Sequence, residues 1–281
     1  MTGSPYTDLS RPPLRETVLS RGLVVPDGLW TEVRVVAETG STNADLAAAA
    51  RSGAGQGLVL IAERQSAGRG RLDRSWQAPE RAAITMSVLL RPPVPTSRLG
   101  WLPLLAGVSL VSAIDRVDRV GARLKWPNDV LLALPSSSRG FGKAAGILAE
   151  AVDGAVVLGM GLNVSQRADE LPPPSDPRAY PPTSLGLAGA ATDRVPLVRA
   201  ILRALEDWYG RWCDASGDPD ACGLREAYRS HCVTIGREVE VSLPSGDITG
   251  TATDIDEDGR LLVVASDGVH TLAAGDVRHV R

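Results

Sequence analysis

Residues 143–163, KAAGILAEAVDGAVVLGMGLN, show what kind of architecture this chain adopts. Two mainly apolar runs, 143–152 and 155–160, are separated by the pair Asp153-Gly154. An Asp-Gly pair between apolar runs is a strong signal for a two-residue hairpin turn, because these residues accept the left-handed backbone that the turn needs. The stretch therefore predicts two antiparallel strands joined by a tight turn.

The chain before this hairpin alternates between short apolar runs and helical segments. Ser41-Thr42-Asn43 is expected to cap an alanine-rich helix that Gly53 ends. A longer helix is predicted for residues 99–120, with Pro103 near its first turn, where proline is tolerated. Further strands are predicted for residues 33–37, 58–62, 83–90, 122–125 and 130–134.

The segments before and after this region of strands and helices have different patterns. Residues 1–32 carry four prolines with little periodicity and are predicted to be a loose arm. Residues 165–182 are polar and rich in proline, which predicts a surface loop or a segment that orders on binding. Helices are expected at 195–212 and 220–232. From residue 237 onward, short β-rich runs alternate with turns, as in a small β-barrel of the SH3-like kind. At about 45 residues this barrel is barely large enough to be stable alone, so we expect it to lean on the main domain.

Composition excludes several classes of protein. A net charge of −3 over 281 residues argues against general affinity for nucleic acid or for an anionic membrane. Pro, Arg and Asp interrupt every candidate for a membrane span of about 18 apolar residues, and the N-terminus lacks the order of a signal peptide. Three widely spaced cysteines, Cys213, Cys222 and Cys232, favour a reducing cytoplasm over a disulfide framework. His231 beside Cys232 lacks the paired-ligand spacing of zinc sites, so no metal site is predicted.

Lysine is scarce in this chain. Lys and Arg together number 30 and only Lys125 and Lys143 are lysine, which leaves 30 − 2 = 28 arginines. Compositional bias accounts for most of this scarcity. Where arginine is the usual cation, a retained lysine suggests a task that needs a compact ammonium and not a planar fork. The segments that begin at Lys125 and Lys143 are therefore the first candidates for chemistry.

The loop 65–73 is dense in glycine and arginine. Gly68-Arg69-Gly70-Arg71 combines a backbone that can approach a ligand closely with guanidinium groups that bind carboxylate or phosphate. Similar sequences also occur in exposed arginine-rich loops and in disordered RNA-binding tracts. Because this one lies between two apolar strands, an anion-binding loop is the favoured interpretation.

Three other motifs are weak when each is taken alone. Gly159-Met160-Gly161 could open a dinucleotide fingerprint, but the third glycine of that motif would fall at Val164. A P-loop ending at Gly142-Lys143 lacks its first glycine and has Ala144 in place of the required Ser or Thr. Residues 126–129 fit a turn with an aromatic plug as well as they fit a site.

Five motifs follow one another in the chain: Ser41-Thr42-Asn43, residues 65–71, residues 125–129, residues 143–148 and residues 159–163. Taken together and in this order, they closely resemble those of the biotin protein ligases, over about residues 33–281. The resemblance implies an α+β fold: a mixed-sheet catalytic domain of the biotin/lipoate ligase type with a small C-terminal SH3-like β-barrel. It divides the chain into an arm (1–32), a biotin- and ATP-binding catalytic domain (33–234) and the C-terminal domain (235–281).

The implied activity is an ATP-dependent ligase reaction. Biotin is activated as biotinyl-5′-AMP with release of pyrophosphate, and is then transferred to a specific lysine of the biotin carboxyl carrier domain of an acyl-CoA carboxylase. Mg²⁺ is expected to accompany ATP, held mostly by phosphate oxygens and water. The same resemblance implies a cytoplasmic enzyme, a monomer or weak homodimer, with no nucleic-acid or membrane partner.

Site residues follow from the resemblance by motif position. Those implied to bind biotin are Ser41, Thr42, Asn43, Gln65, Arg69, Gly70, Arg71 and Lys143. Those implied to contact the nucleotide are Arg71, Trp76, Asn128, Lys143 and Asn163. Catalysis is assigned to Lys143, Arg69 and Arg71, and Asp129 is a hypothesis for the group that orients the acceptor lysine. No protein metal ligand is implied.

Two departures from the family pattern and two alternatives stay open. Leu72-Asp73 stands before Arg74 where the family loop often has a glycine, so Asp73 is expected to weaken the local positive field or to pair with Arg74. An arm of about 30 residues cannot hold the helix-turn-helix domain of some relatives. The alternatives are a lipoate ligase, which has a related catalytic domain, and a biotin-sensing transcriptional repressor. The loop 68–71 and the β-rich tail favour biotin, and the short arm and the negative net charge oppose the repressor.

Overall fold

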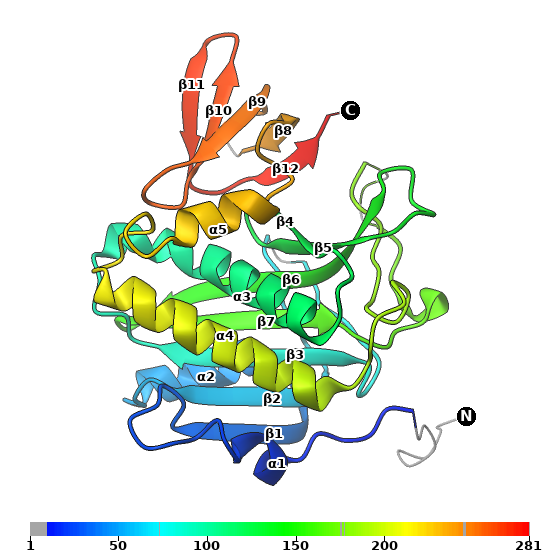
Figure 1. Ribbon diagram of the computed structural model, residues 1–281, viewed down its shortest axis with the longest axis vertical. Coiled ribbons are helices and arrows are strands. Elements are labelled where there is room, and N and C mark those ends of the chain that lie inside the picture. Colours follow the sequence, from blue (N-terminus) through cyan, green and yellow to red (C-terminus); the bar gives the residue numbers. More distant parts are fainter. Residues whose placement is uncertain (1–9, 73, 175, 177, 244–245, 281) are drawn as a thin grey trace.

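One seven-stranded mixed sheet forms the centre of the molecule (Figure 1). The computed structural model describes residues 10–72, 74–174, 176, 178–243 and 246–280. β1 and β2 pair in parallel, and every other pair of neighbours in this sheet is antiparallel. The strand order is β1 (Glu32–Thr39), β2 (Leu58–Gln65), β3 (Ala83–Leu90), β7 (Ala155–Asn163), β6 (Phe141–Val152), β5 (Asp129–Ala133) and β4 (Arg123–Lys125). The predicted α+β class and the predicted mixed sheet are confirmed.

The β6–β7 hairpin lies near the middle of this sheet, as its sequence predicts. Val152 pairs with Ala155, and Asp153 and Gly154 between them have φ angles of 47° and 72°. Both strands are longer than the apolar runs indicated. β7 continues to Asn163 because β3 covers it along its whole length, so the glycines of this segment are held in the sheet.

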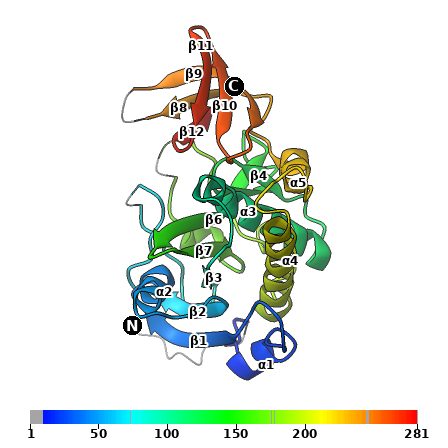
Figure 2. The same cartoon turned by 90° about the vertical axis from the view of Figure 1, so that its left-hand side faces the viewer.

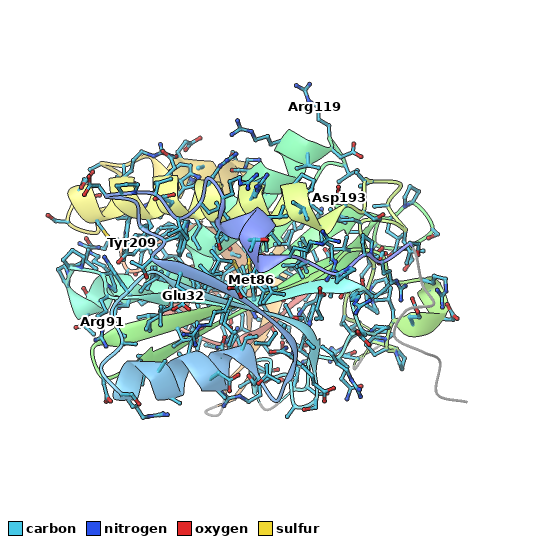
Figure 3. All side chains as sticks on the ribbon, turned by 90° about the horizontal axis from the view of Figure 1, so that it is seen from below. Glu32, Met86, Arg91, Arg119, Asp193 and Tyr209 are labelled. Atoms are coloured by element: carbon cyan, nitrogen blue, oxygen red, sulfur yellow. The ribbon has the colours of Figure 1, made fainter. Side chains whose placement is uncertain are left out.

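Helices cover both faces of the sheet, as Figures 2 and 3 show. α3 (Trp101–Val117) and α4 (Arg194–Asp214) pack on one face, and the capped helix α2 (Thr42–Arg51) packs on the other. Met86 of β3 is 1% exposed and lies between the two layers of helices. The sheet is therefore buried on both faces, and β3 accordingly reads as a continuous apolar run except for its small hydroxyl residues.

Among the described residues, α3 together with the 3-10 turn Thr96–Gly100 before it is long and apolar enough to cross a membrane. However, 67% of its most apolar stretch is buried inside the protein. It begins at Trp101 and not at residue 99, because the preceding residues wind into the tighter turn. The apolar character of α3 is thus that of a core helix.

The N-terminal segment corrects the prediction of a loose arm. Residues 16–20 form α1 (Glu16–Ser20), and Leu14, Leu19, Leu23 and Trp30 are buried in the main core. Trp30 Nε1 donates to the carbonyl of Leu202 in α4 (3.2 Å). The apolar residues are irregularly spaced because the segment crosses α4 and β1 mostly as extended chain and turns. Such packing has no period for a sequence pattern to show.

The predicted helix 220–232 is shorter in the structure. α5 runs from Leu224 to His231, and residues before it form a turn in which the Asp218 carboxylate accepts from the backbone of Asp220 and Ala221 (2.8 and 3.1 Å). Gly223 then has a φ of 75°, which a helix interior excludes. In this turn a side chain takes the backbone N–H groups that a helix would use, and the composition of 220–223 alone does not reveal it.

The C-terminal part forms a five-stranded antiparallel sheet that leans on the main domain, as predicted. The turn 256–259 docks on the first turn of α3. Trp101 Nε1 donates to the Glu257 carbonyl (2.9 Å), and Trp126 Nε1 donates to the Gly259 carbonyl (3.1 Å). The strand order is β11 (Gly268–Leu272), β10 (Leu261–Ala265), β9 (Ile248–Ile255), β8 (Glu238–Ser242) and β12 (Asp276–His279).

His279 at the end of β12 is buried against the main domain, which predicts an acid-sensitive contact. Burial lowers the pKa of His279 to about 3, and the nearby cations Lys125, Arg237 and Arg139 act in the same direction against a smaller opposing effect of Asp129. In the unfolded chain a histidine takes up its proton near pH 6.5. Between pH 6.5 and about 3 the unfolded state therefore binds more protons, and this contribution to stability falls as the pH falls.

We expect the free energy of unfolding to drop between pH 7 and pH 5 by about 2 kcal/mol more in the parent than in His279→Gln, which carries no titrating ring. Urea titrations of both proteins at the two pH values measure the difference, and other titrating groups cancel in the comparison. An equal drop in both proteins would show that His279 does not carry this pH dependence.

Candidate active site

A pocket opens at the junction of the sheet, the glycine- and arginine-rich segment 65–74 (the arginine loop) and the turn after β4. Its walls come from the N-terminus of α2, from β3, β6 and β7, from the segment 69–76 and from the turn 125–129. Within the described part of the chain, the predicted site residues lining it are Ser41, Thr42, Asn43, Gln65, Arg69, Gly70, Arg71, Trp76, Asn128, Asp129 and Lys143. Segments far apart in the sequence thus meet in one cavity.

One end of the pocket is a hydrogen-bonded group of neutral side chains. Gln65 Oε1 accepts from the backbone N–H of Thr42 (2.8 Å), and the hydroxyl of Thr42 lies 2.7 Å from that of Ser87. Ser87 in turn donates to Asn43 Oδ1 (2.6 Å). Asn43 Nδ2 donates to Glu150 Oε2 (2.6 Å), so both ends of its amide are used within the protein. The buried hydroxyls of Ser41, Thr42 and Ser87 line the pocket and suit a small neutral polar group.

The other end of the pocket is cationic. Arg69 pairs with Glu150 (3.4 Å) and Arg71 donates to Asn128 Oδ1 (3.3 Å). The backbone closes the loop, since Gly70 N–H donates to the Arg74 carbonyl (2.6 Å). These partners hold the guanidinium groups at the pocket, where an anionic ligand can compete for them.

Gly68 is required at the base of this loop. A Cβ atom at position 68 would lie 2.3 Å from the carbonyl oxygen of Trp76. That close approach lets Trp76 N–H donate to the Gly68 carbonyl (2.9 Å), which closes the loop on itself. Any larger residue would push the arginines out of place.

Asp129 lies between the two lysines of the chain. Its Oδ1 is 2.6 Å from Lys143 Nζ, and its Oδ2 is 3.7 Å from Lys125 Nζ. Burial alone would raise the pKa of Asp129, but Lys143, Lys125 and Arg71 outweigh burial and bring the pKa below its usual value. Burial lowers the pKa of Lys125, which Asp129 partly opposes. Asp129 is therefore a carboxylate that neutralises a buried cationic group.

Two glycines of β7 make room for two pocket side chains. A Cβ at Gly161 would lie 2.5 Å from the ring of Trp76, and a Cβ at Gly159 would lie 2.2 Å from Asn43 Oδ1. Residues two apart on a strand point to the same face. The Gly-x-Gly spacing that fails as a dinucleotide fingerprint is thus explained by the packing of Trp76 and Asn43 on this face.

Trp76 has a free hydrogen-bond donor in the pocket. Its Nε1 is buried and has no hydrogen-bond partner among the residues that the structure describes. A buried indole N–H without a partner costs free energy. This donor fits a ligand that carries a hydrogen-bond acceptor at this place in the pocket.

Asn163 is the predicted site residue that lies outside the described pocket lining. Its Nδ2 donates to the Thr183 carbonyl (2.9 Å), and its Oδ1 accepts from Gln166 (2.8 Å). Both ends of the amide are thus used to hold the segment after β7. The predicted contact of Asn163 with a nucleotide stays a prediction, and its position in this structure does not support it.

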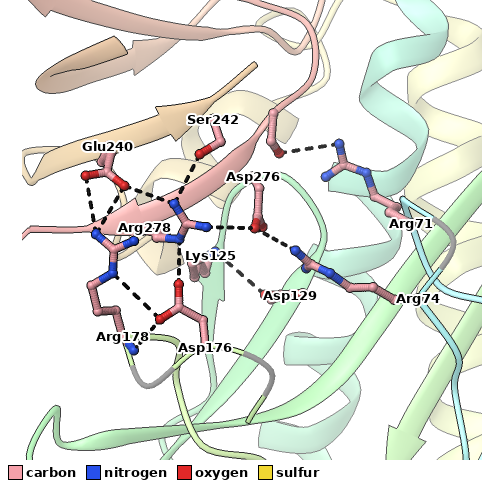
Figure 4. Close-up of polar contacts among 11 residues, drawn as sticks. Arg71, Arg74, Lys125, Asp129, Asp176, Arg178, Glu240, Ser242, Asp276 and Arg278 are labelled. Carbon is pink, nitrogen blue, oxygen red and sulfur yellow. Dashed lines mark hydrogen bonds and ion pairs between the residues drawn. The ribbon is translucent and has the colours of Figure 1, made fainter. Parts of the chain in front are cut away.

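The sequence did not point to several residues that line the pocket. Ser87 carries a partial signal, since a hydroxyl in an otherwise apolar strand indicates a buried polar contact. Lys125 stands out in the sequence as a retained lysine, but the sequence assigns it no role. Asp276 comes from the C-terminal sheet, 2.6 Å from Arg74 (Figure 4), and nothing local in its sequence indicates this position. Asp73, which was expected to affect Arg74, lies outside the described residues.

Comparisons with known proteins agree with this site. Residues 38–166 match the Biotin/lipoate A/B protein ligase family, and residues 234–280 match the Biotin protein ligase C terminal domain. The chain is 44% identical over 280 residues to the biotin–[acetyl-CoA-carboxylase] ligase of Mycobacterium tuberculosis, covering 98% of each protein. It is 29% identical over 270 residues to the bifunctional ligase/repressor of Bacillus subtilis, covering 94% of this chain and 76% of that protein.

Solved structures of biotin protein ligases resemble this chain over both sheets. The biotin protein ligase from Aquifex aeolicus in complex with biotin and ATP has a TM-score of 0.72 at 26% identity, covering 90% of this chain and 100% of that one. Relatives match the catalytic sheet and the C-terminal sheet together, over almost the whole length of this chain. The chain belongs to the biotin protein ligase family.

Proposed function

We propose that this protein activates biotin with ATP to give biotinyl-5′-AMP and pyrophosphate, and then transfers biotin to a lysine of the biotin carboxyl carrier domain of an acyl-CoA carboxylase. One observation carries the proposal: a single pocket joins the neutral polar group of Ser41, Thr42 and Asn43 to a cationic group around Lys143. The first fits a ureido ring, and the second fits a carboxylate beside a phosphate.

The chemical obstacle in the first step is repulsion between two anions. A carboxylate oxygen must reach the α-phosphorus of ATP, and at roughly 4 Å two unit charges repel by about 4 kcal/mol at an effective dielectric near 20. Arg69, Arg71 and Lys143 line the pocket and can offset this repulsion. Fixed cations lower the barrier most where negative charge develops in the transition state.

Asp129 is proposed to act in the second step. The attacking lysine of the carrier must lose a proton, since its ordinary pKa is about 10.4. A carboxylate at the reacting centre can orient that ammonium and accept a hydrogen bond from it. In this structure Lys143 Nζ pairs with this carboxylate, 2.6 Å away. We infer that an arriving acceptor lysine shares Asp129 once Lys143 has turned to the adenylate.

Mg²⁺ is proposed to enter with ATP. Protein sites for Mg²⁺ commonly supply one or two carboxylates and leave the rest to phosphates and water. Asp129 and Asp276 line the pocket, and Glu150 pairs with Arg69 of the same lining, so each of these carboxylates is already paired with a lysine or arginine. This donor set fits a metal that is held mainly by the nucleotide. The metal would contribute by neutralising phosphate charge.

Identification of the adenylate tests the function directly. The protein is incubated with ATP, Mg²⁺ and either biotin or lipoate, and the nucleotide product is measured by mass spectrometry. Biotinyl-5′-AMP with biotin and no lipoyl-AMP with lipoate supports the proposal, and the reverse result identifies a lipoate ligase. A carrier domain added afterwards gains biotin on one lysine.

The arginine loop is expected to become more protected when ligand binds. Arg69–Glu150 and Arg74–Asp276 are half-exposed pairs, and such pairs contribute little to stability. A bound anion replaces them with stronger charge-assisted contacts. Hydrogen exchange of residues 69–73, of which Asp73 lies outside the described residues, should slow on addition of biotin and ATP. Equal exchange with and without ligand would contradict this prediction.

The remaining proposals concern the setting of the enzyme. We propose a catalytic domain at 33–234 and a C-terminal domain at 235–281, a monomer or weak homodimer, and a cytoplasmic location without nucleic-acid partners. The Bacillus subtilis relative is a bifunctional ligase/repressor, so regulation of transcription is the second candidate function. A gel-shift assay with promoter DNA and biotinyl-5′-AMP separates the two, because only a repressor retards the DNA.

A further inference from the structure

His279 lies where the C-terminal sheet meets the catalytic centre. It is the last residue of β12 and is 7% exposed. Its Nδ1 lies 2.9 Å from the hydroxyl of Tyr180, and its Nε2 lies 3.1 Å from the hydroxyl of Thr234. Tyr180 belongs to the proline-rich loop and Thr234 to the segment after α5. One imidazole therefore joins two distant segments of the catalytic domain to the C-terminal sheet.

The Tyr180 side of this junction leads to Lys143. The Lys143 N–H donates to the Pro181 carbonyl (2.7 Å), and the Lys143 carbonyl accepts from Thr183 N–H (2.8 Å). Both backbone polar groups of Lys143 are therefore held by residues 181–183. Tyr180, directly before that segment, packs edge-to-face on His279 at 5.6 Å between ring centroids. The position of the loop relative to β12 thus sets the position of the Lys143 backbone.

The Thr234 side leads to Asp129 and Lys125. Thr234 Oγ1 accepts from the N–H of Trp126 (3.1 Å), the residue between Lys125 and the turn that carries Asp129. Trp126 is 1% exposed and is also held by the Gly259 carbonyl. The Thr234 contact therefore fixes the backbone from which Lys125 and Asp129 extend into the pocket.

A neutral imidazole has one N–H donor and one acceptor nitrogen, and both neighbours of His279 are hydroxyls, which can donate or accept. His279 therefore donates to one of the two hydroxyls and accepts from the other. A neutral imidazole accepts on one side and donates on the other across this distance, without adding charge beside Lys125.

We infer that His279 is a positioning residue for adenylate formation, which sets the separation between Lys143 and the Lys125–Asp129 pair by clamping both supporting segments to β12. The inference rests on the proposed function. β12 also carries Asp276 and Arg278, which pair with Arg74 of the arginine loop and with Asp176 of the proline-rich loop (Figure 4). These two pairs are partly exposed, whereas His279 is buried, its Thr234 contact is buried and its Tyr180 contact is partly buried, so the His279 contacts carry the positioning.

The test compares His279→Phe with His270→Phe, the same substitution on exposed β11 of the same sheet. Phenylalanine keeps a ring against Tyr180 and removes both hydrogen bonds. Single-turnover formation of biotinyl-5′-AMP is measured and normalised to the number of active sites, and biotin affinity is measured separately by calorimetry. We expect the normalised rate of His279→Phe to fall about 10- to 100-fold, since a shift of about 1 Å in a reacting group costs about 100-fold. Its biotin affinity should stay within twofold, because Ser41, Thr42 and Asn43 do not contact β12. His270→Phe should match the parent in both.

Two rescue variants and a double variant separate positioning from loss of folding. His279→Asn places an amide near the Nδ1 position and should restore the Tyr180 contact, and His279→Gln should restore the Thr234 contact. Each is expected to recover part of the rate. Tyr180→Phe should slow the reaction by itself but add little to His279→Phe, because both remove the same link.

Turnover of the parent protein with biotin is measured first. If the parent has no turnover, the result contradicts the proposed function and leaves the role of His279 aside. With a working parent, three results overturn the inference. They are a normalised rate for His279→Phe within twofold of the parent, an equal loss of biotin affinity and rate, or losses for His279→Phe and Tyr180→Phe that simply multiply.

Discussion

Lys143→Arg is expected to lose about a hundredfold or more of the rate of biotinyl-5′-AMP formation while the melting temperature changes little. Lys143 Nζ lies 2.6 Å from Asp129, and the side chain is 33% exposed at the pocket. Arginine preserves the charge, so long-range attraction for ATP and biotin survives. Its guanidinium is wider and planar, and it cannot act as a single donor between a carboxylate and the α-phosphate without displacing one of them.

The size of the loss follows from geometry. A misplacement of about 1 Å at a reacting centre costs about a hundredfold, and loss of one donor to a developing oxyanion costs about 10²–10³. Biotin-dependent pyrophosphate release measures the rate, and thermal unfolding checks the fold. Arg119→Lys, a reverse exchange on the exposed segment after α3, is the control and should leave both unchanged. A rate for Lys143→Arg within threefold of the parent would place the reacting centre elsewhere.

Arg194→Met is expected to lower the free energy of unfolding by about 3–5 kcal/mol, because it leaves Glu63 buried without its counter-ion. Both side chains of this pair are 4% exposed. Glu63 Oε1 also accepts from Leu14 N–H (2.6 Å), and Arg194 donates to the Pro12 carbonyl (2.7 Å). The pair therefore joins the N-terminal segment to β2 and to the start of α4.

Chemical unfolding monitored by tryptophan fluorescence measures this loss. Arg211→Met on the same helix is the matched control: its pair with Asp207 is exposed, and removal of such pairs costs less than about 1 kcal/mol. Glu63→Gln combined with Arg194→Met should recover part of the lost stability, since no uncompensated charge remains. Equal stability of Arg194→Met and the control would show that the buried pair does not hold the N-terminal segment.

Much of the architecture follows from local patterns. The β6–β7 hairpin is determined by two apolar runs and an Asp-Gly turn, and α2 by the Ser41 side chain, which accepts from the Ala44 N–H (3.4 Å). All seven strands of the main sheet were predictable from apolar or alternating runs bounded by turn residues. Local signals failed for the segment 14–30, which packs without a period.

The candidate site was predictable as a set of motifs, but its geometry was not. Ser41 to Asn43, the arginine loop and Lys143 are visible as motifs because the chemistry needs those residue types. Nothing in the sequence places Asp129 between the two lysines, or gives Asn163 two structural partners in place of a pocket position.

The strands, the capped helix, the glycine- and arginine-rich loop and the family are recognisable from the sequence, since each depends on residues that are neighbours in the chain. The contact of Asp276 with Arg74 and the link from Tyr180 through His279 to Thr234 come from the tertiary fold. These contacts connect residues that are 45 to 202 positions apart. Chain closure over such distances is stabilised where the turn 256–259 of the C-terminal sheet docks on Trp101 and Trp126, and no local periodicity records this contact.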